Sequence, residues 1–90
     1  MDKGIYALYH YKMVIPDKLR EFINELRQPL PPVAKIDDPL HMDSLAMMRL
    51  IAFLESELGF VVDDAQLVVE NFETLRAIGQ LLEGRGARMG

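Results

Sequence analysis

Few side chains in this sequence could act as nucleophiles or accept a covalent modification. The chain contains no cysteine, so thiolate chemistry, disulfides and thiolate zinc sites are excluded. Its two histidines, His10 and His41, are too few for a site built from several imidazoles. The serines and threonines are Ser44, Ser56 and Thr74. A covalent role based on an aliphatic hydroxyl therefore falls on one of these three residues.

Ser44 has the most distinctive surroundings of the three. It follows a proline-rich stretch, residues 29–39, in which a regular helix is disfavoured. Asp43 precedes it and Leu45 follows it, and Asp or Ser is a favoured residue at a helix start. A simple helix cap would explain this dipeptide by itself. The apolar residues that follow Ser44 give it a second interpretation, developed below.

Two other kinds of chemistry fit this region poorly. A hydrolase that uses Ser44, His41 and Asp43 is disfavoured by geometry, because the three residues are nearly adjacent in the sequence. The sequence also lacks the Gly-x-Ser-x-Gly motif that presents a nucleophilic serine in many hydrolases. His41 and Asp43 as a metal-binding pair lack further ligands. We therefore expect no catalytic residues and no metal site, and we interpret His41 as a loop residue.

Apolar periodicity predicts three main helices that position these residues. The first begins near Pro16 or Asp17 and ends before Pro29. The second begins at Asp43 or Ser44 and runs to Gly59, and the third runs from a cap at Asn71 to about Glu83. Their predicted core residues recur every three or four positions: Leu19, Phe22, Ile23 and Leu26; Met47, Leu50, Ile51, Leu54 and Leu58; Phe72, Leu75, Ile78 and Leu82.

The remaining segments are less regular. Residues 60–69 have room for one short helix, for which Asp64 is the expected cap. Residues 4–15 suit either a strand or a helix face, and this choice stays open. Residues 84–90 contain three glycines and little to bury, which indicates a flexible tail. The expected fold is therefore all-α, a small four-helix bundle with three main amphipathic helices and one short helix.

The second helix has an apolar outer face as well as an apolar core stripe. On a helical wheel, Leu45, Met48 and Ala52 lie opposite the residues predicted to form the core. A purely solvated face would not contain Leu and Met. Such a patch close to Ser44 and near acidic side chains fits a protein-interaction surface, although packing against the loop or the N-terminal segment would also explain it.

Length and charge set the general class of the molecule. Its 90 residues suit one small domain, and its net charge of -4 disfavours DNA or RNA binding. Residues 37–83 contain ten acidic and two basic residues, so basic protein partners are expected for this half. No stretch approaches the ~20 apolar residues of a membrane span, and no secretory signal is evident. We expect a cytoplasmic monomer.

The motif around Ser44 resembles that of the acyl and peptidyl carrier proteins, a family of phosphopantetheine-binding domains. The resemblance covers residues 16–84 in order and spacing. The matching segments are Leu40-His41-Met42-Asp43-Ser44-Leu45, Glu57-Leu58-Gly59-Phe60, Val62 with Asp64, and Asn71 to Ile78. The family usually has glycine at the position of His41, and its fatty-acid carriers have acidic residues where Ala46 and Arg49 lie here.

The resemblance implies a function and a division of the chain. It implies a 4'-phosphopantetheine arm, derived from coenzyme A and attached to Ser44, with Asp43 assisting Mg²⁺ binding during attachment. It implies partners of two kinds, a phosphopantetheinyl transferase and the enzymes that load and use acyl groups. Because Ala46 and Arg49 depart from the pattern of the fatty-acid carriers, we expect a specialised set of these partners. We expect the second helix to recognise them through Leu45, Met48, Arg49 and Ala52. Residues 1–15 would be an N-terminal extension, 16–84 the carrier domain and 85–90 the tail. The alternative is a helical interaction adaptor without a prosthetic group.

Overall fold

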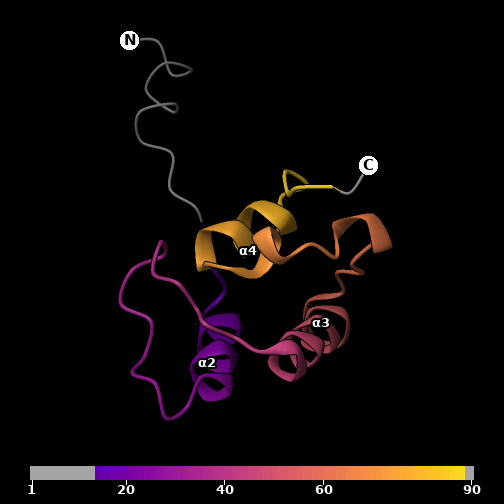
Figure 1. The fold of residues 1–90 in the computed structure, drawn as a ribbon. Helices are drawn as coiled ribbons and strands as arrows, with labels where there is room; N and C mark the ends of the chain where they lie inside the picture. The colour runs from indigo at the N-terminus through magenta and orange to yellow at the C-terminus, as the bar shows by residue number, and fades with distance from the viewer. Residues whose placement is uncertain (1–13, 89–90) are drawn as a thin grey trace, which may run out of the picture.

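A computed structural model describes residues 14–88 of the chain. Its elements are α2 (Asp17–Leu26), α3 (Ser44–Leu58), the 3₁₀ turns η1 (Asp64–Gln66) and η2 (Val69–Phe72), and α4 (Leu75–Leu82) (Figure 1). The prediction of an all-helical fold is confirmed for these residues. Two 3₁₀ turns take the place of the expected short fourth helix. Most of the N-terminal extension expected over residues 1–15 lies outside the described residues.

Helix α2 has the boundaries that its prolines predict. Pro16 is the residue before the helix, and its carbonyl accepts hydrogen bonds from the N–H groups of Leu19 and Arg20, both at 3.1 Å. Leu19 and Ile23 are completely buried, while Phe22 and Leu26 pack against the core from its edge. The predicted apolar face is therefore the face that α2 turns toward the rest of the domain.

Helix α3 has a cap at each end, as the sequence predicts. The carboxylate of Asp43 accepts a hydrogen bond from the N–H of Ala46 at 2.8 Å, which satisfies a free donor of the first turn. Gly59 ends the helix with a φ of 66°, a left-handed conformation that glycine adopts without steric cost. Leu50 and Leu54 are fully buried. Met47, Ile51 and Leu58 pack around them, so the predicted core stripe is confirmed.

Helix α4 begins three residues later than predicted. The Thr74 hydroxyl accepts a hydrogen bond from the N–H of Ala77 at 3.0 Å, so Thr74 is its cap. The predicted cap, Asn71, is wrong. The Asn71 side chain is buried, and its amide donates to the carbonyls of Gln66 and Ala87, each at 2.8 Å. It joins two segments of the chain that are distant in sequence instead of starting a helix.

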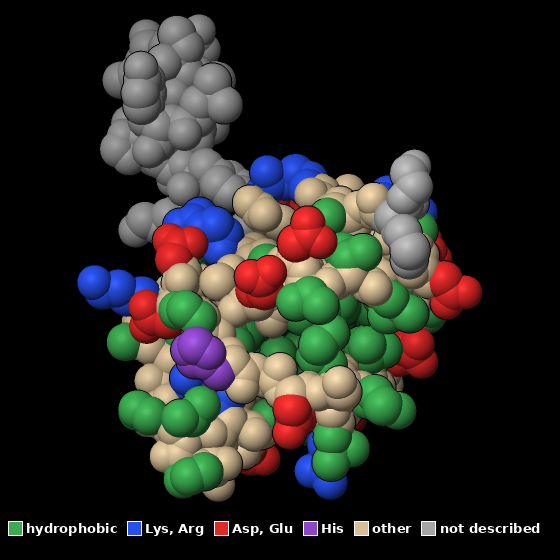
Figure 2. Space-filling view, in the orientation of Figure 1, with side chains coloured by type: hydrophobic (Ala, Val, Ile, Leu, Met, Phe, Trp, Pro, Cys, Tyr) green, Lys and Arg blue, Asp and Glu red, His purple; other side chains and the backbone are tan. Residues whose placement is uncertain are grey.

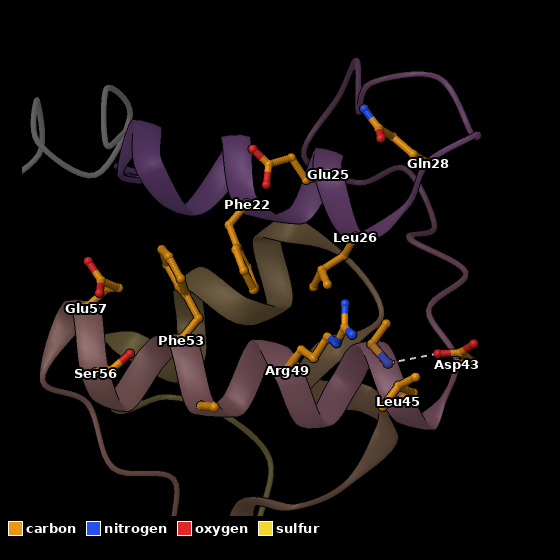
Figure 3. A pocket seen from close by; sticks show the side chains of 12 residues that line it. Phe22, Glu25, Leu26, Gln28, Asp43, Leu45, Arg49, Phe53, Ser56 and Glu57 are labelled. Atoms are coloured by element: carbon orange, nitrogen blue, oxygen red, sulfur yellow. Dashed lines mark hydrogen bonds between the residues drawn. The ribbon is translucent and has the colours of Figure 1, made fainter.

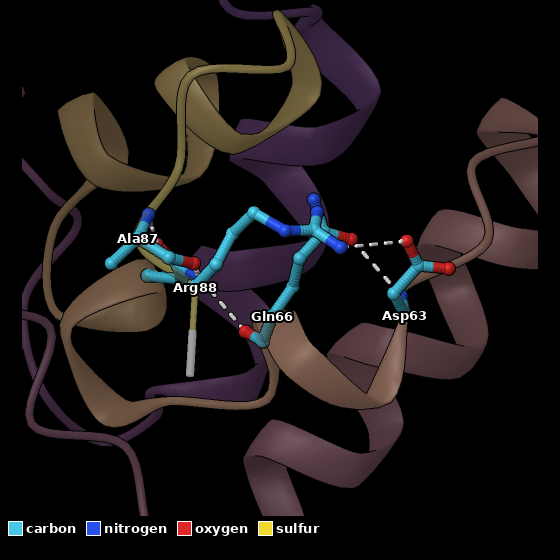
Figure 4. Close-up of polar contacts among 5 residues, drawn as sticks. Asp63, Gln66, Ala87 and Arg88 are labelled. Carbon is cyan, nitrogen blue, oxygen red and sulfur yellow. Dashed lines mark hydrogen bonds and ion pairs between the residues drawn. The ribbon is translucent and has the colours of Figure 1, made fainter. Parts of the chain in front are cut away.

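The segment after α4 is attached to the domain through Asn71. The Oδ1 atom of Asn71 accepts a hydrogen bond from the N–H of Ala87 at 2.7 Å, and Arg88 lies 3.5 Å from the Asp63 carboxylate (Figure 4). Gly86 fits so closely that an added Cβ would lie 2.9 Å from Asn71 Oδ1. Residues 86–88 therefore have contacts that the expectation of a flexible tail did not include, and residues 89–90 lie outside the described part.

The η1 turn also differs from the prediction by one residue. Asp63, not Asp64, precedes it, and the N–H of Asp63 donates to the side-chain oxygen of Gln66 at 3.0 Å. This hydrogen bond links the last residue of the turn to the residue before it, and the Gln66 side chain that accepts it is buried. Together, η1 and η2 carry the chain from the end of α3 to the start of α4 (Figure 1).

One apolar core holds these elements together. Its fully buried large side chains come from all three helices and from the loop between α2 and α3: Leu19, Ile23, Leu40, Leu50, Leu54, Leu75, Ile78 and Leu81. Burying a leucine or isoleucine side chain stabilises the fold by about 1.5–3 kcal/mol, so these residues provide much of the favourable free energy. Within residues 14–88, no helix is long and apolar enough to cross a membrane.

Candidate attachment site and its flanking surfaces

The loop that leads to Ser44 is fixed at Leu40, four residues before the serine. The Leu40 side chain is completely buried. Its N–H donates to the carbonyl of Glu73 at 2.9 Å, and its carbonyl accepts from Arg27 Nε at 2.9 Å. Leu40 is thus attached to the residue before the α4 cap on one side and to the end of α2 on the other. This attachment sets the position at which α3 can begin.

A second contact ties the same loop to α4. Arg76 Nε and Nη2 donate to the two oxygens of the Asp37 carboxylate at 2.6 and 2.9 Å, and the N–H of Arg76 donates to the carbonyl of Ile36 at 2.9 Å. The hydrogen bond from Arg76 lowers the pKa of Asp37, and the same hydrogen bond raises the pKa of Arg76. Both side chains are exposed, so the ion pair adds little to the stability of the fold. Its two hydrogen bonds mainly fix the position of the loop relative to α4.

His41 turns the chain between this anchored loop and α3. Its φ is 54°, a left-handed conformation that costs a residue other than glycine roughly 1–2 kcal/mol. Histidine is one of the residue types that adopt it more often than most. The carrier-protein motif usually has glycine at this position, and the backbone shows why glycine suits it. The His41 side chain is exposed.

Asp43 and Ser44 occupy the start of α3 as a cap and a first helical residue. Both side chains are exposed. The Asp43 carboxylate uses Oδ1 to cap the N–H of Ala46, and the Asp43 carbonyl accepts from the N–H of Met47 at 2.9 Å. Across residues 14–88, no group of three or more His, Cys, Asp or Glu side chains could hold a metal ion.

The three hydroxyls differ in what surrounds them. The Thr74 hydroxyl is occupied by its cap to Ala77 and is half-buried. Ser56 is exposed near the end of α3, far from a helix start. Ser44 is exposed at the first position of α3, where the N–H groups of the first turn have no partner within the helix. Of the three, Ser44 alone combines exposure with an environment that favours an attached anion.

A wide groove runs between α2 and α3, with a volume of about 1160 Å³ (Figure 3). Three of the predicted recognition residues, Leu45, Arg49 and Ala52, line it, whereas Met48 does not. The predicted outer face of α3 is confirmed as exposed: the exposed fraction is 60% for Leu45 and 67% for Met48. The contribution of α2 was missed by sequence reasoning, because a helical wheel of one helix does not show which other helix lies beside it.

An aromatic pair crosses the groove. The rings of Phe22 from α2 and Phe53 from α3 are stacked, with centroids 4.2 Å apart and an angle of 13° between their planes. Both are half-buried, so the groove has an apolar floor. Each phenylalanine lies at the edge of the apolar core stripe of its own helix. This position is the one signal in the sequence that could have indicated the contact between the two rings.

A second apolar surface lies on another side of α3. Figure 2 shows hydrophobic side chains gathered over α3 and the segment that leads from it to α4. Val61 and Val69, from that segment, have exposed fractions of 67% and 64%. Met48 lies on α3 outside the groove lining and is equally exposed. Ser44 is one helical turn from Met48 and lies on the same side of α3.

Comparison with known protein families decides what this arrangement is. The family model for the phosphopantetheine attachment site matches residues 21–82, which is more than half of the chain. The chain belongs to this family. Its members attach 4'-phosphopantetheine covalently and act as carrier domains. The corresponding comparisons with curated proteins and with solved structures gave no match. The resemblance recognised in the sequence is therefore confirmed at the level of the family.

The start of α3 in this carrier domain fits the prosthetic group of the family. A phosphodiester on Ser44 would carry a negative charge at a helix N-terminus, where the free N–H groups and the helix dipole stabilise it. Ser44 is exposed, so a group attached to it would extend into solvent. Asp43 is negative and does not stabilise the phosphodiester directly. Its cap instead holds the first turn of α3, and therefore Ser44, in a fixed orientation.

Proposed function

We propose that Ser44 carries the 4'-phosphopantetheine arm and that the domain moves thioester-linked acyl or aminoacyl intermediates between partner enzymes. The observation that supports this best is the position of Ser44. It is the exposed first residue of a capped helix, and the loop before it is anchored to α2 and to α4. In this proposal the domain is a substrate and a carrier and does not itself catalyse a reaction.

Attachment would join Ser44 to the phosphopantetheine part of coenzyme A. The Ser44 oxygen forms a bond to the phosphorus that bears the pantetheine, the bond from that phosphorus to the bridging oxygen breaks, and the nucleotide part leaves with that oxygen. The serine proton passes to a base of the transferase. Asp43 would bind Mg²⁺ together with the transferase and coenzyme A, since a single carboxylate cannot hold the ion alone.

The domain's own residues would position and present the arm. When bound, the group supplies a terminal thiol that carries cargo as a thioester. The chain has no cysteine, so no second thiol competes for the cargo. The anchored loop and the α3 cap fix the point of attachment, and the tether raises the effective concentration of the cargo at a docked partner. Leu45, Met48, Arg49 and Ala52 are exposed beside Ser44 and would contact the transferase and the enzymes that load and use the cargo.

Thiol titration after treatment with coenzyme A and a phosphopantetheinyl transferase tests the attachment. The untreated chain has no cysteine and should give no signal, so each thiol on the desalted product reports one arm. We expect one thiol per chain for the wild type and for Ser56→Ala, and none for Ser44→Ala. A thiol on folded Ser44→Ala would refute the assignment of Ser44, and the absence of a thiol on the wild type would refute the proposed function.

A further inference from the structure

The surface of α3 near Ser44 has two sides with different chemistry. Ser44 and Met48 are four residues apart and share one side of α3. Arg49 and Phe53 are also four residues apart, and they face the groove beside α2 (Figure 3). Neither Ser44 nor Met48 lines the groove. A ligand in the groove would therefore approach α3 from a side that the attachment serine does not occupy.

Arg49 is the cation in this groove, and it has no partner within the described part of the chain. Three other arginines are engaged: Arg27 with the Leu40 carbonyl, Arg76 with Asp37, and Arg88 with Asp63. Arg49 makes no hydrogen bond and no ion pair with any residue between 14 and 88. In Figure 3 its side chain extends from α3 toward Leu26 of α2. A planar guanidinium without a partner can bind a carboxylate by donating two parallel hydrogen bonds to it.

Acidic side chains surround this cation at the rim of the groove. Glu25 comes from α2, Glu57 comes from the end of α3, and Asp43 lies at the opposite end (Figure 3). Glu57 has an exposed partner in Lys18 at 3.8 Å, a distance at which an exposed ion pair contributes little. The lining therefore presents one positive group near its middle, negative groups at its rim, and the stacked Phe22 and Phe53 rings as an apolar floor.

This pattern identifies the kind of ligand that would be complementary. A small anion would meet Arg49 but would be repelled by three carboxylates, and a small cation would be attracted by the carboxylates but would leave Arg49 unpaired. A ligand that carries charges of both signs at separate points satisfies the whole lining. The groove volume of about 1160 Å³ exceeds the ~300–1000 Å³ typical of small-molecule pockets, and exposed side chains such as Leu45, Arg49 and Ala52 line it. A segment of a protein fits both requirements.

We propose that the groove between α2 and α3 binds an amphipathic helix of a partner enzyme, with a carboxylate of that helix on Arg49. Its apolar side chains would pack on Phe22 and Phe53, and its basic side chains would meet Glu25 and Glu57. A helix fits because a third helix can pack into the channel between two neighbours. This proposal rests on the carrier function proposed above. It adds that a partner holds the domain by the α2 side while the arm on Ser44 stays free on the other side.

Two designed peptides test the chemistry of the groove without a known partner. The first is a cross-linked amphipathic helix of about four turns, with leucines one turn apart, a glutamate beside them and lysines on both flanks. The second is identical except that lysine replaces the glutamate. Calorimetry with the full chain should show tighter binding of the first peptide. Chemical-shift changes should map to the groove residues, Arg49 and Phe53 among them, and not to Val61 or Val69.

Charge reversal then shows whether Arg49 is responsible. We expect Arg49→Glu to lower the affinity for the glutamate peptide by about tenfold or more. The same variant should bind the lysine peptide more tightly than the wild type does. Arg20→Glu makes the same charge change on α2, at a residue that does not line the groove, and should leave both affinities unchanged. Failure of both peptides to bind, equal binding of the two, or an equal effect of Arg20→Glu would overturn the proposal.

A last measurement separates this proposal from the carrier function. In the arm-bearing protein, saturating glutamate peptide should leave the rate of thiol alkylation by iodoacetamide unchanged, because Ser44 itself does not line the groove. A clear slowing would contradict the separation. If Ser44 accepts no arm, the carrier function fails whatever the peptides do; if it accepts the arm and the peptides do not bind in the groove, only the groove proposal fails.

Discussion

Helices α3 and α4 meet the rest of the domain in opposite ways. Within the eight residues of α4, Leu75, Ile78, Gly79 and Leu81 are buried. Within the fifteen residues of α3, the buried ones are Leu50 and Leu54. Leu45 and Met48 near the start of α3 instead have exposed fractions of 60% and 67%. The comparison indicates that α4 is fixed by its packing, while α3 uses a narrow core stripe and leaves most of its surface available to other molecules.

The buried helix also determines where the exposed one begins. Glu73, just before α4, accepts the hydrogen bond from Leu40, and Arg76 in the first turn of α4 binds Asp37 and Ile36. These contacts fix the loop that leads to Ser44. A change in the α4 core should therefore act on stability first, whereas a change on the surface of α3 should act on binding or attachment first. Substitutions in the two helices can therefore separate an effect on stability from an effect on binding.

The largest effect is expected from the core of α4. Ile78→Ala removes a fully buried side chain and should lower the free energy of unfolding by about 2–5 kcal/mol. Urea denaturation measures this loss. The rate of arm attachment per folded molecule should stay normal in conditions where the variant is folded. A variant with wild-type stability and slow attachment would show that α4 acts on the site and not on the fold.

Substitutions of Asp43 separate its cap from its charge. Asp43→Ala loses the cap to Ala46 and should cost about 1 kcal/mol, whereas Asp43→Asn keeps a good cap and should cost little. Both variants lose the carboxylate that would bind Mg²⁺, so both should attach the arm much more slowly than the wild type when the metal concentration is limiting. If Asp43→Asn is as stable and as fast as the wild type, Asp43 is a cap and nothing more.

Met48→Glu tests the exposed side of α3 that carries Ser44. A charge on a surface residue should change the free energy of unfolding by no more than about 0.5 kcal/mol. We expect a slower reaction with the transferase, because Met48 is one turn from Ser44. Leu50→Glu is the matched control in the core stripe, and it should unfold the domain. Thermal melts of the two variants distinguish the faces, and similar losses of stability in both would contradict this assignment.

The smallest effect is expected from the ion pair that anchors the loop. Arg76 lowers the pKa of Asp37 below its ordinary 3.8, so the pair stabilises the fold above that pH, and the contribution is lost as the pH falls through the lowered pKa. Asp37→Asn should therefore be slightly less stable than the wild type at pH 7, with a difference that shrinks in acid. Asp64→Asn, a change at an exposed aspartate, serves as the control. A difference that is the same at low pH would exclude the ion pair as its cause.

Much of the individual helices could be predicted from the sequence, because the necessary signals are local. Apolar spacing predicts the stripe of Leu50 and Leu54, and Pro16, Asp43 and Gly59 mark helix ends through their backbone and capping preferences. The motif around Ser44 is likewise a short stretch. The effect of His41 in place of the usual glycine could not be predicted, and the structure explains it by a φ of 54° at this residue.

The contacts between segments could not be predicted in the same way. Asn71 has the type and position of a helix cap, but its partner Ala87 is sixteen residues away and only the folded chain brings the two together. The bond from Arg27 to Leu40 spans thirteen residues, and nothing in either residue's neighbourhood indicates it. The groove requires Phe22 and Phe53 from two helices. Such features depend on how helices pack, which the periodicity of one helix does not determine.

The most direct test of the central claim is localisation of the arm by tandem mass spectrometry. After treatment with coenzyme A and a phosphopantetheinyl transferase, the wild-type chain should gain the mass of one phosphopantetheine, and fragmentation should place that mass on Ser44. Ser44→Ala should gain nothing, while Ser56→Ala should behave as the wild type. Added mass on Ser56, on Thr74 or on the folded Ser44→Ala chain would contradict the account.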